Sequence, residues 1–163
     1  MSFDITTLIT DRTAEDVEYV NSLREKLLQG TATASEVAEW LKADLKGAYN
    51  VSDLDRVNAA VVHLHARCNK LGYRVLITPQ PNWTDADTPT DEQLQSYLSN
   101  VEALREVLRI QGNIPMDMVG FRYQEANELE RILVEVDTML KNIIASFVYC
   151  GQPYCGQIWE DFT

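Results

Sequence analysis

The fold is decided by a stretch near the C-terminal end of the sequence, residues 123–149, which reads YQEANELERILVEVDTMLKNIIASFVY. Its apolar residues recur at alternating intervals of three and four, and this stripe consists of Ala126, Leu129, Leu133, Val136, Leu140, Ile143 and Phe147. Such spacing gives an α-helix one apolar face. At 1.5 Å per residue this helix would be about 40 Å long. A compact chain of this size is about 40 Å across, so we expect the helix to span the whole molecule.

Four more helices are predicted upstream, from capping residues at their starts and glycines near most of their ends. They cover residues 13–28, 33–47, 52–72 and 90–110. The last two repeat the alternating spacing, at Leu54, Val57, Val61, Leu64, Cys68 and Leu71 and then at Leu94, Tyr97, Val101, Leu104 and Leu108. Seams of this kind pack at shallow crossing angles. We therefore predict an all-α fold, a five-helix bundle.

We expect a single helical domain covering residues 1–163. The three N-terminal helices lie in 9–72, an extended connection in 73–89, the two long helices in 90–150, and an aromatic C-terminal segment in 151–163. Prolines at alternate positions exclude helix from the second half of the connection. Its first half, residues 73–78, could form a strand paired with residues 3–9 or with the segment after Cys150. A minor two-stranded β element is therefore an alternative for this part of the chain.

Composition and charge limit the classes of function. Apolar residues make up 45% of the chain and charged residues 24%, as in ordinary globular domains. The 25 acidic residues outnumber the 14 basic ones, and the resulting charge of −11 argues against nucleic acid or an anionic membrane surface as partner. We expect no signal peptide, and the longest apolar stretch, residues 143–150, is too short to span a membrane. The three cysteines fit a reducing compartment better than a disulfide scaffold.

The residues that could bind metal or catalyse a reaction form no convincing motif. The ligand types in His63-x-His65-x-x-Cys68 point in different directions around a helix, which predicts ordinary helix content. Cys150 and Cys155 suggest a disulfide or half a zinc site, but no second ligand pair exists in the chain. The acidic residues of the last helix are expected to form a solvated face: Glu125, Glu128, Glu130, Glu135 and Asp137. We therefore predict no catalytic residue, no metal site and no cofactor.

Aromatic residues near the C-terminal end and in the extended connection are the candidate interaction sites. The tetrapeptide that begins at Tyr149 is repeated at Tyr154, and Trp159 and Phe162 follow. Such residues either fold back onto the bundle or contact another chain. Trp83, in the connection, either covers the end of the bundle or anchors a partner.

Short motifs between about residues 9 and 158 add a further indication. They are Asp11-Arg-Thr13-Ala-Glu-Asp16-Val17, Glu39-Trp40-Leu41, Leu45-Lys-Gly47-Ala-Tyr49-Asn50, Asp53-Leu54-Asp-Arg56-Val57, Trp83-Thr84-x-x-Asp87-x-Pro89-Thr90, Tyr97-Leu98-x-Asn100-Val101, Tyr123-x-Glu125-Ala-Asn127-Glu-Leu-Glu130 and the closing pair Tyr149-x-Gly151 and Tyr154-x-Gly156. In these motifs the chain resembles small structural proteins encoded in the tail and baseplate modules of Firmicutes phages and prophages. That family usually carries Ser after each closing Tyr, where this chain has Cys150 and Cys155.

The resemblance implies a non-enzymatic virion or tail-accessory protein. Such a protein contacts other phage structural subunits and can form a homo-oligomer. It is a component of the virion and lies in the bacterial cytoplasm before assembly. Three alternatives stay open. The chain could be a glycan-binding module for host attachment with Trp83, Tyr154 or Trp159 as stacking platforms. It could also be a small cell-wall hydrolase, which needs paired carboxylates or a zinc site in a cleft, or a prophage-encoded assembly factor or regulator.

Overall fold

In a computed structural model the described residues are 3–42, 44–84 and 87–150, with side chains described as far as residue 146. These residues form the helices α1 (Ala14–Gln29), α2 (Ala34–Trp40), α3 (Val51–Lys70), α4 (Asp91–Leu108) and α5 (Tyr123–Cys150), and one 3-10 turn, η1 (Ile5–Thr7). The predicted all-α fold with five helices is confirmed.

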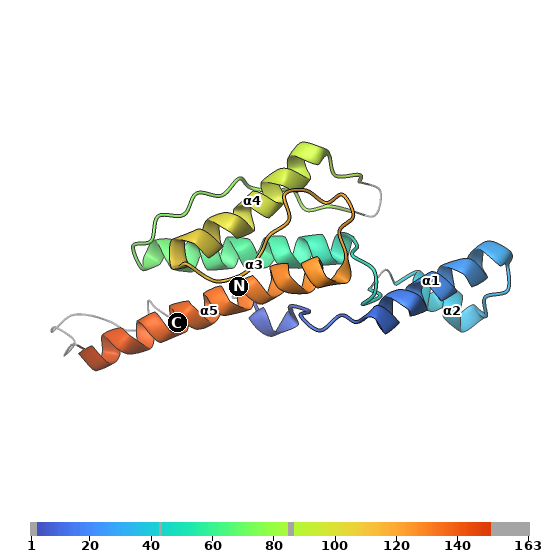
Figure 1. Cartoon of the computed structure of the whole chain (residues 1–163), viewed down its shortest axis with the longest axis horizontal. Helices are drawn as coiled ribbons and strands as arrows, with labels where there is room; N and C mark the ends of the chain where they lie inside the picture. Colours follow the sequence, from blue (N-terminus) through green and yellow to red (C-terminus); the bar gives the residue numbers. More distant parts are fainter. Residues whose placement is uncertain (1–2, 43, 85–86, 151–163) are drawn as a thin grey trace.

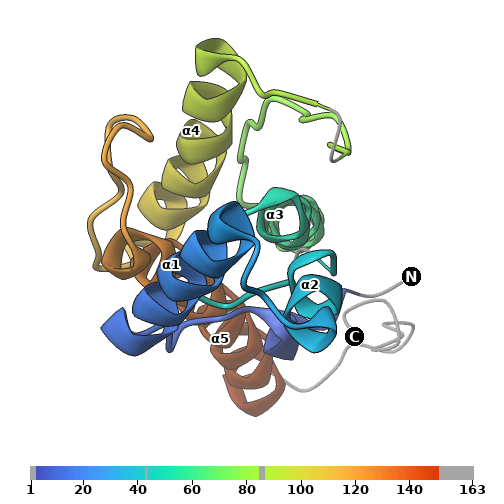
Figure 2. The same cartoon turned by 90° about the vertical axis from the view of Figure 1, so that its right-hand side faces the viewer.

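The helices divide into a bundle of three and a separate hairpin (Figure 1). α3, α4 and α5 pack against one another and enclose the core, whereas α1 and α2 lie beside each other beyond one end of this bundle. Viewed from that end, the hairpin lies in front of the bundle (Figure 2). Along the sequence, the three N-terminal helices are grouped apart from the two long C-terminal ones. In the structure α3 instead packs with α4 and α5, and only α1 and α2 lie apart.

The predicted apolar stripes supply the core of the bundle. Their buried members are Leu54, Val57, Val61, Leu64 and Cys68 on α3, Tyr97, Val101 and Leu104 on α4, and Ala126, Leu129, Leu133, Val136 and Leu140 on α5. Burial decreases toward the C-terminal end of α5, where Ile143 and Ile144 are only half-buried. Figure 1 shows the reason: α5 runs past the end of α3.

The three bundle helices run in the same general direction, so the two segments that join them must return along the bundle (Figure 1). The first return segment contains residues 73–78, the alternative strand. The described residues contain no strand: the Thr78 N–H donates to Asn100 Oδ1 at 2.7 Å, and the Thr78 carbonyl accepts from Asn100 Nδ2 at 2.8 Å. A side chain of α4 thus binds the backbone groups that a neighbouring strand would bind. Residues 3–9 hold η1 instead, and the segment after Cys150 lies outside the described residues.

Two helix boundaries differ from the prediction. α3 begins two residues earlier than a Ser52 cap would allow, because the Asn50 side chain accepts from the Ser52 N–H at 3.0 Å and the Asp53 carboxylate accepts from the Asn50 N–H at 2.9 Å. α2 ends at Trp40 and does not continue to Gly47. Gly47 instead lies against the first turn of α1, where a Cβ atom would come within 2.0 Å of the Asp16 carbonyl oxygen. The chain must leave the helix after α2 to make this close backbone approach.

We predict that Gly47→Ala will separate the start of α1 from the link at residues 44–50. The added methyl group has no space, and overpacking of this kind costs about 1–3 kcal/mol. Amide hydrogen exchange should accelerate around Asp16 and Val17, and urea unfolding should give the loss of stability. The control is Gly30→Ala, at the other end of α1, where no atom lies within 4 Å of the added Cβ. Because Gly30 has a φ of 69°, this change strains the end of the helix, so the two variants are compared by exchange at Asp16 and not by unfolding free energy. Faster exchange at Asp16 in that control as well would contradict the steric explanation.

Candidate functional site

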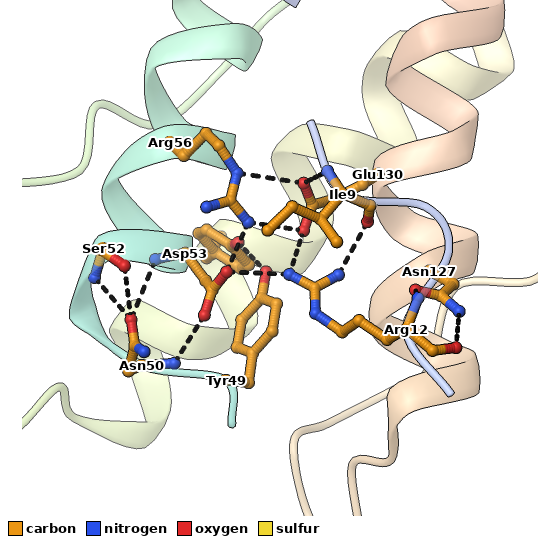
Figure 3. A network of polar contacts seen from close by, with 10 residues as sticks. Ile9, Arg12, Tyr49, Asn50, Ser52, Asp53, Arg56, Asn127 and Glu130 are labelled. Atoms are coloured by element: carbon orange, nitrogen blue, oxygen red, sulfur yellow. Dashed lines mark hydrogen bonds and ion pairs between the residues drawn. The ribbon is translucent and has the colours of Figure 1, made fainter. Parts of the chain in front are cut away.

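A cluster of four charged side chains lies at the junction of the N-terminal segment with α3 and α5 (Figure 3). Arg12 precedes α1, Asp53 and Arg56 lie on the first turns of α3, and Glu130 lies on α5. Two guanidinium groups face two carboxylates, so the charges balance. We call this group of four residues the charge cluster.

Glu130 is the centre of the charge cluster and is 0% exposed. Its Oε1 accepts from Arg12 Nη2 at 2.7 Å and from Arg56 Nη2 at 3.0 Å. Its Oε2 accepts from the Ile9 N–H at 2.7 Å and from Arg56 Nε at 3.2 Å. A carboxylate has about four acceptor positions. All of them are therefore filled by donors from the N-terminal segment and α3.

The backbone around Arg12 is fixed by α5 as well. The Arg12 N–H donates to Asn127 Oδ1 at 2.9 Å, and the Arg12 carbonyl accepts from Asn127 Nδ2 at 2.8 Å. The Arg12 guanidinium lies 5.4 Å from the centre of the Tyr49 ring, a cation–π distance. The Tyr49 and Tyr97 hydroxyls are 2.5 Å apart, which joins the cluster to α4. Burial raises the pKa of both phenols, so both remain protonated at neutral pH.

Asp53 has two roles, one local and one long-range. It is the third residue of α3 and completes the cap with Asn50, and its Oδ1 accepts from Arg12 Nη2 at 2.8 Å as well as from Arg56. The N-terminus of α3 is thereby oriented by the same ion pairs that fix Arg12. The carboxylate oxygens of Glu130 and Asp53 already accept hydrogen bonds from cations or backbone amides. The charge cluster therefore has a structural role: it holds the N-terminal segment, α3 and α5 together.

The expectation of a solvated acidic face on the last helix is wrong for two of its residues. Glu130 belongs to the buried charge cluster, and Asp137, which is also buried, pairs with Arg67 of α3 and with Lys141 at 2.8 Å. Both are buried because Glu130 precedes Leu133 by three residues and Asp137 follows it by four, which places them beside the apolar stripe. That spacing is the sequence signal that could have identified them.

A groove of 770 Å³ lies beside Asp137, between the last turns of α3, the later part of α5 and the N-terminal segment. We call it the terminal groove. Its apolar lining consists of Phe3, Ile5, Ala66, Leu71, Ile144 and Ala145, and its polar lining of Asp4, Thr6, His63, Arg67, Lys70, Asp137 and Lys141. Burial lowers the pKa of His63, which is therefore neutral at pH 7. The groove lies in the size range of small-ligand and peptide sites.

The residues of the ligand-type motif are separated, as the helical spacing predicts. Cys68 is 0% exposed in the core, His63 lines the terminal groove, and His65 Nε2 lies 3.1 Å from the Val75 carbonyl oxygen. No group of three or more His, Cys, Asp or Glu residues in the described ranges could hold a metal ion. Cys150 lies at the end of α5, and Cys155 lies outside the described residues.

Of the predicted interaction residues, the structure describes the side chain of Trp83 alone. Trp83 is 5% exposed and packs edge-on against Tyr97 with ring centres 6.1 Å apart, while its backbone N–H donates to Asp55 Oδ1 at 3.1 Å. Its indole therefore covers the bundle, and the alternative of a surface anchor or sugar platform at Trp83 has to be corrected. Tyr149 lies in the last turn of α5, beyond the described side chains; Tyr154, Trp159 and Phe162 lie outside the described residues.

Within the described residues, none of the helices combines the length and apolar character needed to cross a membrane. Comparison with known proteins gives no match among family models, curated proteins or solved structures.

We predict that Arg12→Met will lower the free energy of unfolding by about 3–5 kcal/mol, because it leaves Glu130 and Asp53 buried with one guanidinium between them. Urea unfolding followed by circular dichroism measures the change. The matched control is Lys46→Met, which removes a cation from surface ion pairs with Asp11 and Asp16. Exposed pairs contribute about 0–1 kcal/mol. Equal effects of the two substitutions would show that the charge cluster does not stabilise the fold.

The buried thiol of Cys68 predicts a loss of stability in alkaline solution. Burial raises the pKa of Cys68 from 9.0 to about 11, so the unfolded chain releases this proton at lower pH than the folded chain. The protonated Cys68 thiol therefore contributes fully to the free energy of unfolding below pH 9. This contribution is lost as the pH rises toward 11, at no more than about 1.4 kcal/mol per pH unit. Unfolding free energies at pH 8, 9 and 10 should therefore fall more steeply in the parent than in Cys68→Ala. Parallel curves would exclude Cys68 as the cause.

Proposed function

We propose that this chain is a non-enzymatic structural or accessory component of a phage or prophage tail, acting through contacts with other structural subunits. The resemblance of its short motifs to tail and baseplate proteins supplies the biological setting. The all-α fold and the structural character of the charge cluster are compatible with a protein that works by presenting surfaces.

The observation that carries this proposal is the α1–α2 hairpin. It lies beyond the end of the bundle, and Leu23 is the single buried residue among the residues of its two helices (Figure 2). The two helices are joined by polar contacts, with the Tyr19 hydroxyl donating to Glu39 at 2.8 Å and Lys26 pairing with Glu36 at 2.6 Å.

Apolar side chains remain on the outside of this hairpin. Leu28 is 77% exposed and Leu41 is 76% exposed, and Tyr19 and Val37 are exposed as well. Scattered exposed leucines are ordinary on protein surfaces, but here they lie on a small projecting unit with almost no core of its own. A partner that covers the hairpin would bury these side chains.

Contact with another chain through the aromatic C-terminal residues Tyr149, Tyr154, Trp159 and Phe162 stays an alternative to their folding back onto the bundle. Sugar binding through Tyr154 or Trp159 stays an alternative, whereas the buried Trp83 no longer supports it. An assembly factor would present the same surfaces but would leave the mature particle.

Particle composition tests the proposal. The source strain is induced, particles are purified on a density gradient, and the chain is quantified by mass spectrometry. We expect a fixed ratio to the other tail proteins in the parent and a reduced ratio in the double variant Leu28→Gln, Leu41→Gln. The matched control is Leu76→Gln, which alters an 89% exposed leucine in the segment between α3 and α4.

Two outcomes would contradict parts of this proposal. Absence of the chain from purified particles, with abundant protein left in the lysate, would favour an assembly factor or regulator. Normal incorporation of the Leu28, Leu41 double variant would exclude the hairpin as the contact surface.

A further inference from the structure

The terminal groove has the chemistry of a site for an acidic, aromatic peptide. Phe3, Ile5, Leu71 and Ile144 give it an apolar lining, and Phe3 lies with its ring centre 6.3 Å from that of His63. Arg67, Lys70 and Lys141 line it together with the two carboxylates of Asp4 and Asp137, and Arg67 and Lys141 both pair with Asp137. The lining therefore carries one net positive charge, in a chain whose net charge is −11.

One segment of the chain matches this chemistry. Residues 151–163 read GQPYCGQIWEDFT and hold Tyr154, Ile158, Trp159 and Phe162 together with two acidic residues, Glu160 and Asp161, and no lysine or arginine. Apolar rings can cover the apolar lining of the groove, while the carboxylates next to them meet its cations. Opposite charges of this kind set the orientation of a bound segment.

The connection is long enough for the segment to reach the groove. Ala145 lines the groove, and α5 continues from there to Cys150, a rise of about 7.5 Å. From Cys150 to Trp159 an extended chain can span up to about 30 Å. The chain can therefore reverse its direction after α5 and still bring Trp159 back beside Ile144.

We infer that the terminal groove binds residues 157–162 of the same chain, with Trp159 on its apolar lining and Glu160 and Asp161 toward its cations. The sequence leaves two roles open for these aromatic residues, and the groove favours folding back over contact with another chain. This inference does not depend on the proposed function. It rests on the lining of the groove and the sequence of residues 151–163, and both are the same whatever the protein does.

Fluorine NMR on the full chain labelled with 5-fluorotryptophan can test this. The chain has three tryptophans, Trp40, Trp83 and Trp159, and the substitution Trp159→Phe identifies the third resonance. In the parent we expect the Trp159 resonance to lie away from its position in urea and to be shielded from a soluble nitroxide. Ala66→Glu places a carboxylate in the groove and should move this resonance toward its unfolded position.

Ala59→Glu is the matched control. Ala59 and Ala66 are both exposed, lie two turns apart on one face of α3, and differ in that Ala66 alone lines the groove. Unchanged Trp40 and Trp83 resonances show that each variant is folded. The inference fails if Trp159 already has its unfolded shift in the parent, if both variants move it equally, or if its position depends on protein concentration. The last result would place the segment in the groove of a second copy.

Discussion

The contact between Arg12 and Glu130 is the constraint on which the arrangement of the whole chain depends. One guanidinium joins the segment before α1 to the first turn of α3 and to the N-terminal third of α5. Removing these charges from water costs several kcal/mol per ion, and the cost is offset because Glu130 accepts four hydrogen bonds and each carboxylate contacts two cations. The charge cluster holds the N-terminal segment at one place on the bundle, and so fixes the position from which the α1–α2 hairpin projects.

Local sequence signals predicted the elements well. The capping boxes at Thr13, Thr33 and Thr90 start helices where they were expected, because each side chain binds a backbone amide only three residues away. The alternating spacing identified the core for the same reason, since a helical face follows from the sequence alone. Features that depend on distant residues could not be predicted: α2 ends before Gly47, which meets the backbone of Asp16, and packing against Tyr97 decides between the two roles that the sequence leaves open for Trp83. The local sequence predicts a solvent-exposed Glu130, because its partner Arg12 is 118 residues away.

The fold and the surfaces limit what the chain can do, although the biological setting comes from the resemblance of its motifs. The buried charges are used within the molecule, and the metal-ligand types are dispersed over the core, the groove and a loop contact. With the terminal groove taken up by the chain's own C-terminal segment, as we infer above, the surface left for a partner is the hairpin that projects beyond one end of the bundle (Figure 1).

The long sequence separation within the charge cluster also determines the order in which the molecule can be completed during synthesis. The hairpin needs only local contacts, such as the one between Lys26 and Glu36, and can form as soon as α2 has left the ribosome. Arg12, Asp53 and Arg56 must wait for Glu130, and at about 5–20 residues per second the interval between Asp53 and Glu130 is about 4–15 s. During that interval the nascent chain holds two arginines with one carboxylate and an apolar surface that α5 has not yet covered. Among the described helices, α5 is therefore the one that closes the bundle, and a ribosome that stalls before it would leave the bundle open.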